Sequence, residues 1–118
     1  MDDLDLVIEA ACRLPLDYEQ LGVYSAVEIL RRSGFPGRRS EIDAERLRSC
    51  LASHSDLVRA WLEWPDGNFS TPAWYVRECD PARFELRFGD ALHGVFEDRV
   101  TAAAELAIRE LASIADLA

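Results

Sequence analysis

Apolar residues recur at helical spacing in the first stretch of the chain, residues 3–14. Spacings of three and four residues place them on one face of a helix. The positions on this face are Leu4, Val7, Ile8, Ala11 and Leu14. Acidic residues at the start favour a helix N-terminus, because they complement its dipole. Pro15 ends the pattern, so we expect a helix over residues 3–14.

The stretch "YSAVEILRRSG", residues 24–34, predicts a second helix with both of its ends marked. Ser25 and Glu28 have the spacing of a capping box, in which side chains satisfy backbone N–H groups at the helix start. Gly34 stands where a helix C-terminal glycine is common. The pattern leaves open whether Asp17–Val23 joins this helix or forms a turn of its own.

The next segment, "FPGRRSE", has the composition of a loop. After it, Asp43 predicts the N-cap of a helix. The apolar positions of this helix are Leu47, Cys50 and Leu51. Either Ser53 or Ser55 breaks or recaps it. The helical stripe then continues through Leu57, Val58, Trp61 and Leu62. A turn at Pro65–Gly67 is expected to stop it.

After this turn the spacing of apolar residues changes from about 3.6 residues to about 2, which is typical of strands. Ala73–Glu78 is rich in strand formers. Arg83–Phe88 alternates strictly and predicts a half-buried antiparallel strand. Its apolar face holds Phe84, Leu86 and Phe88, and its polar face holds Arg83, Glu85 and Arg87. Ala91–Phe96 predicts a third strand, weakened by Gly94. The turns "DPA" and "GD" join the three strands into a meander.

Asp98 predicts the N-cap of a closing helix. The apolar face of this helix holds Val100, Ala104, Ala107, Ile108, Leu111 and Ile114. The order of elements predicts one α+β domain over residues 1–118. It has N-terminal helices, a small antiparallel three-stranded meander, and a C-terminal helix packed on it. We expect Trp61 and Trp74 in the core, and Trp64, beside the helix stop, to be partly exposed.

Acidic residues outnumber basic ones by 22 to 13, which gives a formal net charge of −9. The excess acid lies after residue 40, and such a surface repels phosphate backbones and attracts basic partners. We therefore expect no nucleic-acid binding, in spite of four arginines near one turn, Arg31, Arg32, Arg38 and Arg39. No run approaches the ~18 apolar residues of a membrane span. The acidic start of the chain differs from a secretory signal, so we expect a cytoplasmic location and no membrane partner.

Three widely spaced cysteines, Cys12, Cys50 and Cys79, are expected to be reduced and mostly buried. Cys50 and His54 stand at i and i+4, but two ligands do not make a zinc site. Cys79 and His93 are a candidate nucleophile and base across a hairpin, although no third group is marked to orient them. We therefore expect no metal, no cofactor and no catalytic residue, and the chain is not expected to be an enzyme.

Several segments between residues 24 and 115 share a pattern of helix stops and aromatic residues. They are "YSAVEILRRSGF", "IDAERLRSCL", "LVRAWLEW", "AWYV" and "EDRVTAAAELAIRELASI". This pattern resembles that of small bacterial immunity-like proteins of polymorphic toxin and contact-dependent growth inhibition systems. The resemblance implies a shared fold and, less strongly, a shared function. The chain departs from the pattern at Pro65–Phe69, where such proteins commonly carry acidic and then basic residues.

Three functions fit this sequence. We favour an immunity protein that binds a cognate toxin domain, a nuclease with a basic cleft, and so denies entry to its substrate. The second is a small acidic chaperone or adaptor for another protein partner. The third is an enzyme or small-ligand binder whose site has no motif.

Acidic residues at turns, with neighbouring aromatic residues, form the candidate partner-binding surface. Its members are Glu63, Trp64, Asp66, Phe69, Asp90, Glu97 and Asp98. Rim charges mostly set the rate of association, whereas a buried aromatic anchor often dominates the binding energy. In a meander, Asp66 and Asp90 are expected to share one end of the sheet, with Asp80 at the other.

Overall fold

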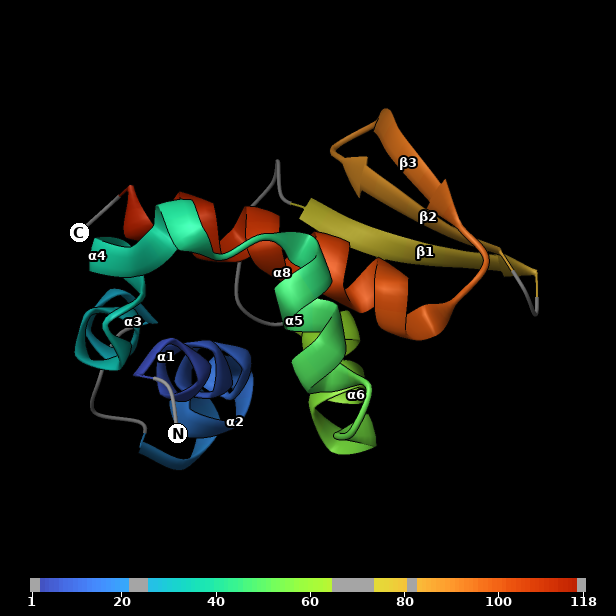
Figure 1. Ribbon diagram of the computed structural model, residues 1–118. Helices are drawn as coiled ribbons and strands as arrows, with labels where there is room; N and C mark the ends of the chain where they lie inside the picture. The colour runs from blue at the N-terminus through green and yellow to red at the C-terminus, as the bar shows by residue number, and fades with distance from the viewer. Residues whose placement is uncertain (1–2, 22–25, 65–73, 81–82, 117–118) are drawn as a thin grey trace.

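The computed structural model describes residues 3–21, 26–64, 74–80 and 83–116. Helices lie at one end of the molecule and a small sheet at the other, and one long helix runs between them (Figure 1). The elements, in chain order, are α1 (Asp3–Cys12), α2 (Leu14–Leu21), α3 (Ala26–Ser33), α4 (Phe35–Arg38), η1 (Arg39–Glu41), α5 (Ala44–Leu51), α6 (Ser55–Glu63), β1 (Trp74–Asp80), β2 (Arg83–Phe88), β3 (Ala91–Phe96) and α8 (Arg99–Ala115). This is the predicted α+β fold, with a C-terminal helix packed on a three-stranded meander.

The first helix ends two residues before its predicted end, because Pro15 lies inside a new helix rather than after the old one. α1 ends at Cys12 and α2 begins at Leu14, which places Pro15 in the first turn of α2. A proline is tolerated there, since the first N–H groups of a helix have no partner within it. The open question about Asp17–Val23 is answered for its first five residues, which belong to α2. Ser25 of the predicted capping box lies outside the described residues.

The segment "FPGRRSE" is not the predicted loop. Residues 35–38 form α4 and residues 39–41 form the 3₁₀ turn η1. Gly34 precedes them with a φ of 88°, the left-handed conformation expected of a C-terminal glycine. Phe35 is buried in the core, and its N–H donates to the hydroxyl of Ser33. The buried side chain therefore outweighs the helix-breaking composition around Pro36.

α5 and α6 follow the predicted pattern of a helix, a break and a second helix. The Asp43 carboxylate accepts a hydrogen bond from the N–H of Arg46, which confirms its role as N-cap. The first of these helices ends at Leu51, and the second begins at Ser55. The N-cap residue of α6 is His54, which makes no side-chain capping bond, so neither Ser53 nor Ser55 caps this helix.

The sheet has the strand order β1-β2-β3, and both pairs are antiparallel. β2 and β3 have the predicted bounds, and β1 runs two residues past its predicted end. Trp74 pairs with Phe88, so the start of β1 lies at the same end as the β2–β3 turn. Phe84 pairs with Phe96, which places the end of β3 at the opposite end. Gly89 in the turn has a φ of 58°, as the predicted "GD" turn requires.

α8 is buried on two faces, which joins the helices to the sheet. On the sheet side, the guanidinium of Arg99 lies 6.0 Å from the ring centre of Phe84, and that of Arg109 lies 5.3 Å from the ring centre of Trp74. Ala102 and Leu106, which lie between these arginines in sequence, are fully buried. α8 contacts all three strands and also α3, α5 and α6.

The opposite face of α8 belongs to the helical core, as its apolar pattern predicts. The core residues on that face are Ala103, Ala104, Ala107, Leu111, Ile114 and Ala115. The same core includes Trp61, which is fully buried as predicted. Trp74 is half-buried and packs on the sheet side, so the prediction that it shares the core of Trp61 is wrong.

Candidate functional site

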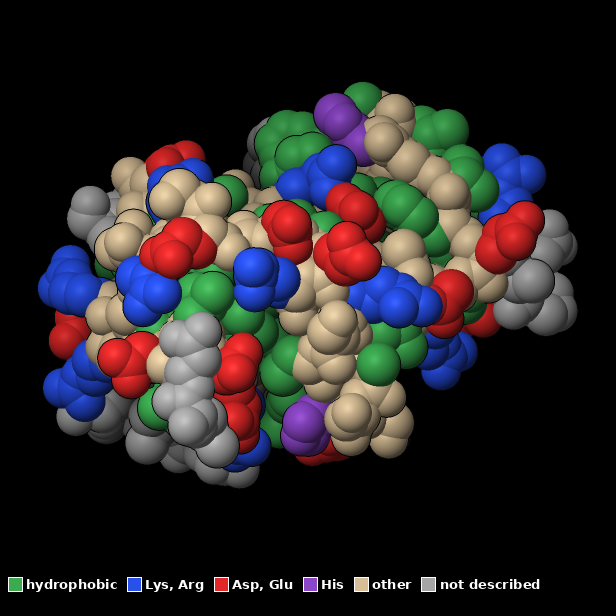
Figure 2. Space-filling model, viewed as in Figure 1, with side chains coloured by type: hydrophobic (Ala, Val, Ile, Leu, Met, Phe, Trp, Pro, Cys, Tyr) green, Lys and Arg blue, Asp and Glu red, His purple; other side chains and the backbone are tan. Residues whose placement is uncertain are grey.

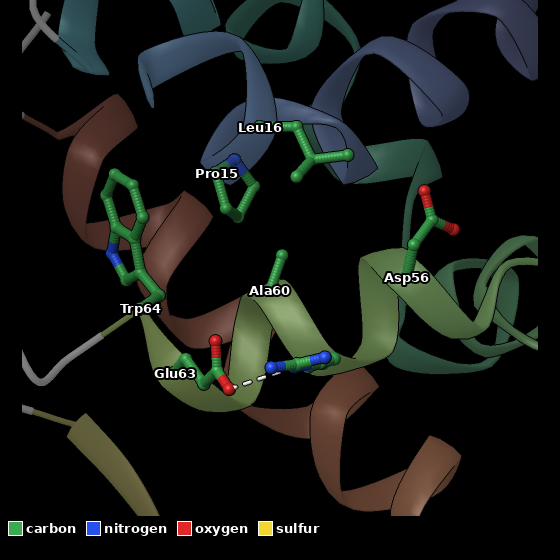
Figure 3. Close-up of a pocket in the computed structure, with 7 residues that line it drawn as sticks. Pro15, Leu16, Asp56, Ala60, Glu63 and Trp64 are labelled. Atoms are coloured by element: carbon green, nitrogen blue, oxygen red, sulfur yellow. Dashed lines mark hydrogen bonds and ion pairs between the residues drawn. The ribbon is translucent and has the colours of Figure 1, made fainter. Parts of the chain in front are cut away.

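A small cleft lies between α2 and α6, beside two residues of the predicted partner surface (Figure 3). It has a volume of about 180 Å³. Pro15 and Leu16 form one wall, and Ala60 of α6 faces them across the cleft. Glu63 lies at the rim, exposed, and accepts a hydrogen bond of 3.1 Å from the guanidinium of Arg59. The cleft is too small for a typical small-molecule ligand.

Trp64 is buried, with only 4% of its surface exposed, so the prediction of partial exposure is wrong. Its ring meets Tyr18 of α2 edge-on at a centroid distance of 5.2 Å and lies 6.1 Å from Trp61. The contact with Tyr18 comes from a helix that is distant in sequence, whereas Trp61 lies in α6, which Trp64 follows. A side chain that is already covered within the chain offers little surface to a partner, so Trp64 is not the predicted anchor.

Glu97 and Asp98 lie between β3 and α8, at the opposite end of the sheet from Asp90. Asp98 caps α8 and accepts hydrogen bonds from the N–H groups of Val100 and Thr101. It also pairs with Arg48 of α5 at 3.3 Å. The pKa of Asp98 is lowered, first by a hydrogen bond from the Thr101 hydroxyl at 2.8 Å and then by the bonds from the two N–H groups and from Arg48. Asp98 therefore has a structural role, and the predicted acidic residues do not form one continuous patch.

Asp90 lies at the tip of the β2–β3 hairpin, in a turn held by two side chains. The Tyr75 hydroxyl donates to the carbonyl of Gly89 at 3.0 Å, and the Arg87 guanidinium donates to the carbonyl of Asp90 at 3.2 Å. The pairing of Trp74 with Phe88 places the start of β1 at this end, whereas Cys79 and Asp80 belong to the other. The expected separation of Asp90 from Asp80 is thus confirmed. Asp66 and Phe69 lie outside the described residues.

Aromatic and apolar side chains surround this turn, and the sequence pattern did not mark them as a candidate site. The ring of Trp74 lies 4.9 Å from that of Phe88 and 4.7 Å from that of His93. Phe88 is 37% exposed and Leu92 is 50% exposed. Figure 2 shows hydrophobic side chains at the surface over the strands. Trp74 and Phe88 lie on one face of the sheet, whereas Leu92, which pairs with Arg87, lies on the other. We call Trp74, Phe88, Asp90 and Leu92, which together surround the tip, the hairpin-tip surface. The sequence places Phe88 on the apolar face of a strand and at the end of that strand. This position beside a turn is the signal that could have identified Phe88 as an exposed apolar residue.

Glu85 lies in the middle of β2 and is buried, whereas the arginines on either side of it in the alternating pattern are exposed at Arg83 and partly buried at Arg87. Its carboxylate pairs with Arg87 at 2.8 Å and with Arg83 at 3.2 Å. The hydrogen bond from Arg87, helped by one from the Cys79 thiol, lowers the pKa of Glu85. The polar face of β2 is therefore a closed ion-pair network rather than a set of free charges.

The three cysteines are free, but only Cys12 is fully buried. Cys79 is exposed, which contradicts the prediction of mostly buried thiols. The candidate contact between Cys79 and His93 is absent from the described residues, because β1 and β3 are not neighbours in the sheet and His93 packs on Trp74. Cys50 and His54 do meet, since Nδ1 of His54 lies 2.9 Å from the carbonyl oxygen of Cys50.

Within the described parts of the chain, no group of three or more His, Cys, Asp or Glu residues is arranged to hold a metal ion. No helix among the same residues is long and apolar enough to cross a membrane. Comparisons of the chain with family models, with curated proteins and with solved structures found no match. The resemblance to immunity-like proteins therefore rests on the sequence pattern alone.

Proposed function

We propose that this chain is a cytoplasmic, non-enzymatic inhibitor of the immunity type, which binds a basic domain of a cognate toxin through the hairpin-tip surface. The observation that carries the proposal is the exposure of Phe88 and Leu92 on both sides of Asp90, in a turn fixed by Tyr75 and Arg87. A rigid turn loses little conformational freedom on binding, so more of the contact energy becomes affinity.

The charge of the chain supports a basic partner. The net charge of −9 favours long-range attraction to a positively charged domain, such as the phosphate-binding cleft of a nuclease. Locally, acidic and basic side chains alternate over the face in Figure 2. Several acids among the described residues are paired with arginines, among them Glu41 with Arg38 and Glu105 with Arg109. An acid such as Asp90, which no ion pair joins to another described residue, is better placed to meet a basic partner.

One feature favours the alternative of a small adaptor. β3 is an edge strand, with Leu92 and Val95 exposed along it. An edge strand can add a strand from an extended segment of another protein through backbone hydrogen bonds. In that case, binding would depend on β3 and little on Asp90 or on salt.

The partner is tested first by co-purification of the tagged chain with the product of the neighbouring reading frame. Surface plasmon resonance at two salt concentrations then compares variants. We expect Asp90→Arg to slow association most at low salt, and Leu92→Ser to speed dissociation. Glu45→Arg is the matched control, since Glu45 is an exposed acid on α5 and the change in charge is equal.

The outcomes separate the two functions. Equal effects of Asp90→Arg and Glu45→Arg would show that only net charge matters and would remove the hairpin tip from the interface. Loss of binding in Leu92→Ser, with no effect of salt or Asp90→Arg, would favour the adaptor. A partner that binds all three variants like the wild type would overturn the proposed surface.

A further inference from the structure

A pocket between α1 and α5 brings a thiol and an imidazole together, away from the hairpin-tip surface. It has a volume of about 390 Å³ and is lined by Cys50 and His54 on one side and by Asp5, Ile8 and Glu9 of α1 on the other. Cys50 is half-buried, lines this pocket and also packs against the core. A small solute in the pocket therefore lies beside Cys50.

A second thiol lies behind the first. The side chains of Cys12 and Cys50 lie close enough to influence each other's ionisation, and Cys12 has no exposed surface. Cys12 is the last residue of α1, and its carbonyl accepts a hydrogen bond of 2.9 Å from the indole N–H of Trp61. This bond fixes the end of α1 against α6. Cys12 is thus held beside Cys50, where solvent does not reach it.

The surroundings favour the thiolate at Cys50 over the thiolate at Cys12. The hydrogen bond with Cys12 and the nearby His54 lower the pKa of Cys50 to about 7, against the opposing effects of partial burial and of Glu9. The pKa of Cys12 is raised, first by its hydrogen bond to Cys50 and then by its burial. Because the thiolate is the reactive form of cysteine, Cys50 is the more nucleophilic of the two near neutral pH.

We propose that Cys50 and Cys12 form a peroxide-reactive pair, in which Cys50 is the thiol that is oxidised and Cys12 is the thiol that resolves it. The inference does not depend on the proposed inhibitor function. It rests on a pocket that admits a small hydroperoxide, a half-buried thiol in its wall, and a buried thiol in contact behind it.

The chemistry balances with hydrogen peroxide as the oxidant. The Cys50 thiolate attacks one peroxide oxygen, an S–O bond forms, and the O–O bond breaks. The product is a sulfenic acid, and the leaving hydroxide takes up a proton to become water. The sulfur of Cys12 then attacks the sulfur of the sulfenic acid, its proton leaves with the hydroxyl as a second water, and a Cys12–Cys50 disulfide forms. The peroxide is reduced by two electrons that come from the two thiols.

If solvent exposure alone set the order in which the three thiols are oxidised, the order would differ from the proposed one, which makes the proposal testable. Cys79 is the exposed cysteine and would react first if access to solvent decided the matter. Cys79→Ser is therefore a matched control that removes a thiol outside the pair.

The full-length chain is treated with a small excess of hydrogen peroxide at pH 7, and the remaining thiols are alkylated. Peptide mass spectrometry then identifies the products. We expect a Cys12–Cys50 disulfide in the wild type and in Cys79→Ser, with a mass loss of about 2 Da for the two hydrogens removed. Cys12→Ser should instead accumulate a sulfenic acid at Cys50 that dimedone traps, and Cys50→Ser should leave Cys12 reduced.

The wild type alone can overturn the proposal, so it does not depend on whether the variants fold. Oxidation of Cys79 before Cys50, or absence of a Cys12–Cys50 peptide when Cys50 is oxidised, would refute it. Circular dichroism of each variant shows whether it is folded. If Cys12→Ser is unfolded, the order of alkylation of the three wild-type thiols between pH 5 and 9 still identifies the most reactive thiol, which must be Cys50, and the disulfide-linked wild-type peptide identifies its partner.

Discussion

Glu110 is the acidic residue that the structure buries without an ion pair among the described residues. It lies on α8 with 3% of its surface exposed. Desolvation raises its pKa from 4.5 to about 7, because burial disfavours the charged form. The helical pattern of α8 did not mark this residue, since it lies outside the apolar face that the sequence predicts.

Stability should therefore depend on pH through Glu110. Between pH 4.5 and about 7, the folded chain keeps a proton that the unfolded chain releases. The contribution of Glu110 to the free energy of unfolding is fully present below pH 4.5, falls as the pH rises through this window, and is lost above it. We expect Glu110→Gln to be about 1–3 kcal/mol more stable than the wild type at pH 8, with much less difference at pH 4.5.

Urea denaturation at both pH values measures this difference. Glu45→Gln, a change of the same kind at an exposed position, is the control and should shift stability little at either pH. If Glu110→Gln gave the same shift at pH 4.5 and pH 8, ionisation of Glu110 would not be the cause.

At the scale of elements, two aspartates begin two helices in similar ways but with different neighbours. Asp43 accepts one hydrogen bond from the backbone of α5, at 2.9 Å. Asp98 accepts two from the backbone of α8, at 3.3 Å each, and also binds Arg48 and the Thr101 hydroxyl. Loss of a cap typically costs about 1 kcal/mol. We expect Asp43→Ala to cost about this much and Asp98→Ala somewhat more.

Asp98→Asn removes the charge and keeps one of the two oxygens that cap α8, because the amide replaces the other oxygen with an NH2 group. Thermal denaturation of the three variants provides the comparison. Asp98→Asn should lose less than Asp98→Ala. If it lost as much, the ion pair with Arg48 rather than the cap would stabilise the start of α8.

Elements with a local signal could be predicted from the sequence. The strict alternation of Arg83–Phe88 fixes a strand without help from distant residues, and its bounds are confirmed. α4 could not be predicted, because Pro36 and Gly37 indicate a loop and only the burial of Phe35 in the core favours a helix there. The burial of Trp64 under Tyr18 is equally a product of distant contacts.

The same limit applies to the candidate sites. The acids at turns could be recognised in the sequence, but their ion pairs could not. Asp98, for example, caps α8 and pairs with Arg48. Cys50 and His54 were recognised as neighbours because they lie one helical turn apart. The contact of Cys50 with Cys12 depends on how α1 packs against α5, which no local pattern encodes.

At the scale of the whole molecule, α8 ties the sheet and the helical core to one another. Leu86 lies under the sheet and Leu111 lies in the helical core, and both are fully buried. Because the two sides share α8, we expect them to unfold together. Leu86→Ala and Leu111→Ala should each lower the free energy of unfolding by about 2–5 kcal/mol. Both should shift a single transition, as in a two-state protein.

Hydrogen exchange of amides in β2 and α5, measured along a urea series, tests this cooperativity. The two sets of amides should converge on one free energy of opening. Leu92→Ala is the control, because Leu92 is exposed and should change stability by less than about 0.5 kcal/mol. Exchange of β2 at a much lower free energy than α5 in Leu86→Ala would show that the sheet opens alone.

The placement of the three indoles gives this chain a built-in optical probe. Trp61 and Trp64 lie in the helical core, whereas Trp74 is half-buried at the hairpin tip beside the His93 ring. Fluorescence from the first two follows the integrity of the fold. Fluorescence from the third responds to the polarity of whatever covers the tip. A titration without any label should therefore distinguish a partner that docks on the hairpin from one that docks elsewhere, since only the first alters the Trp74 component of the spectrum.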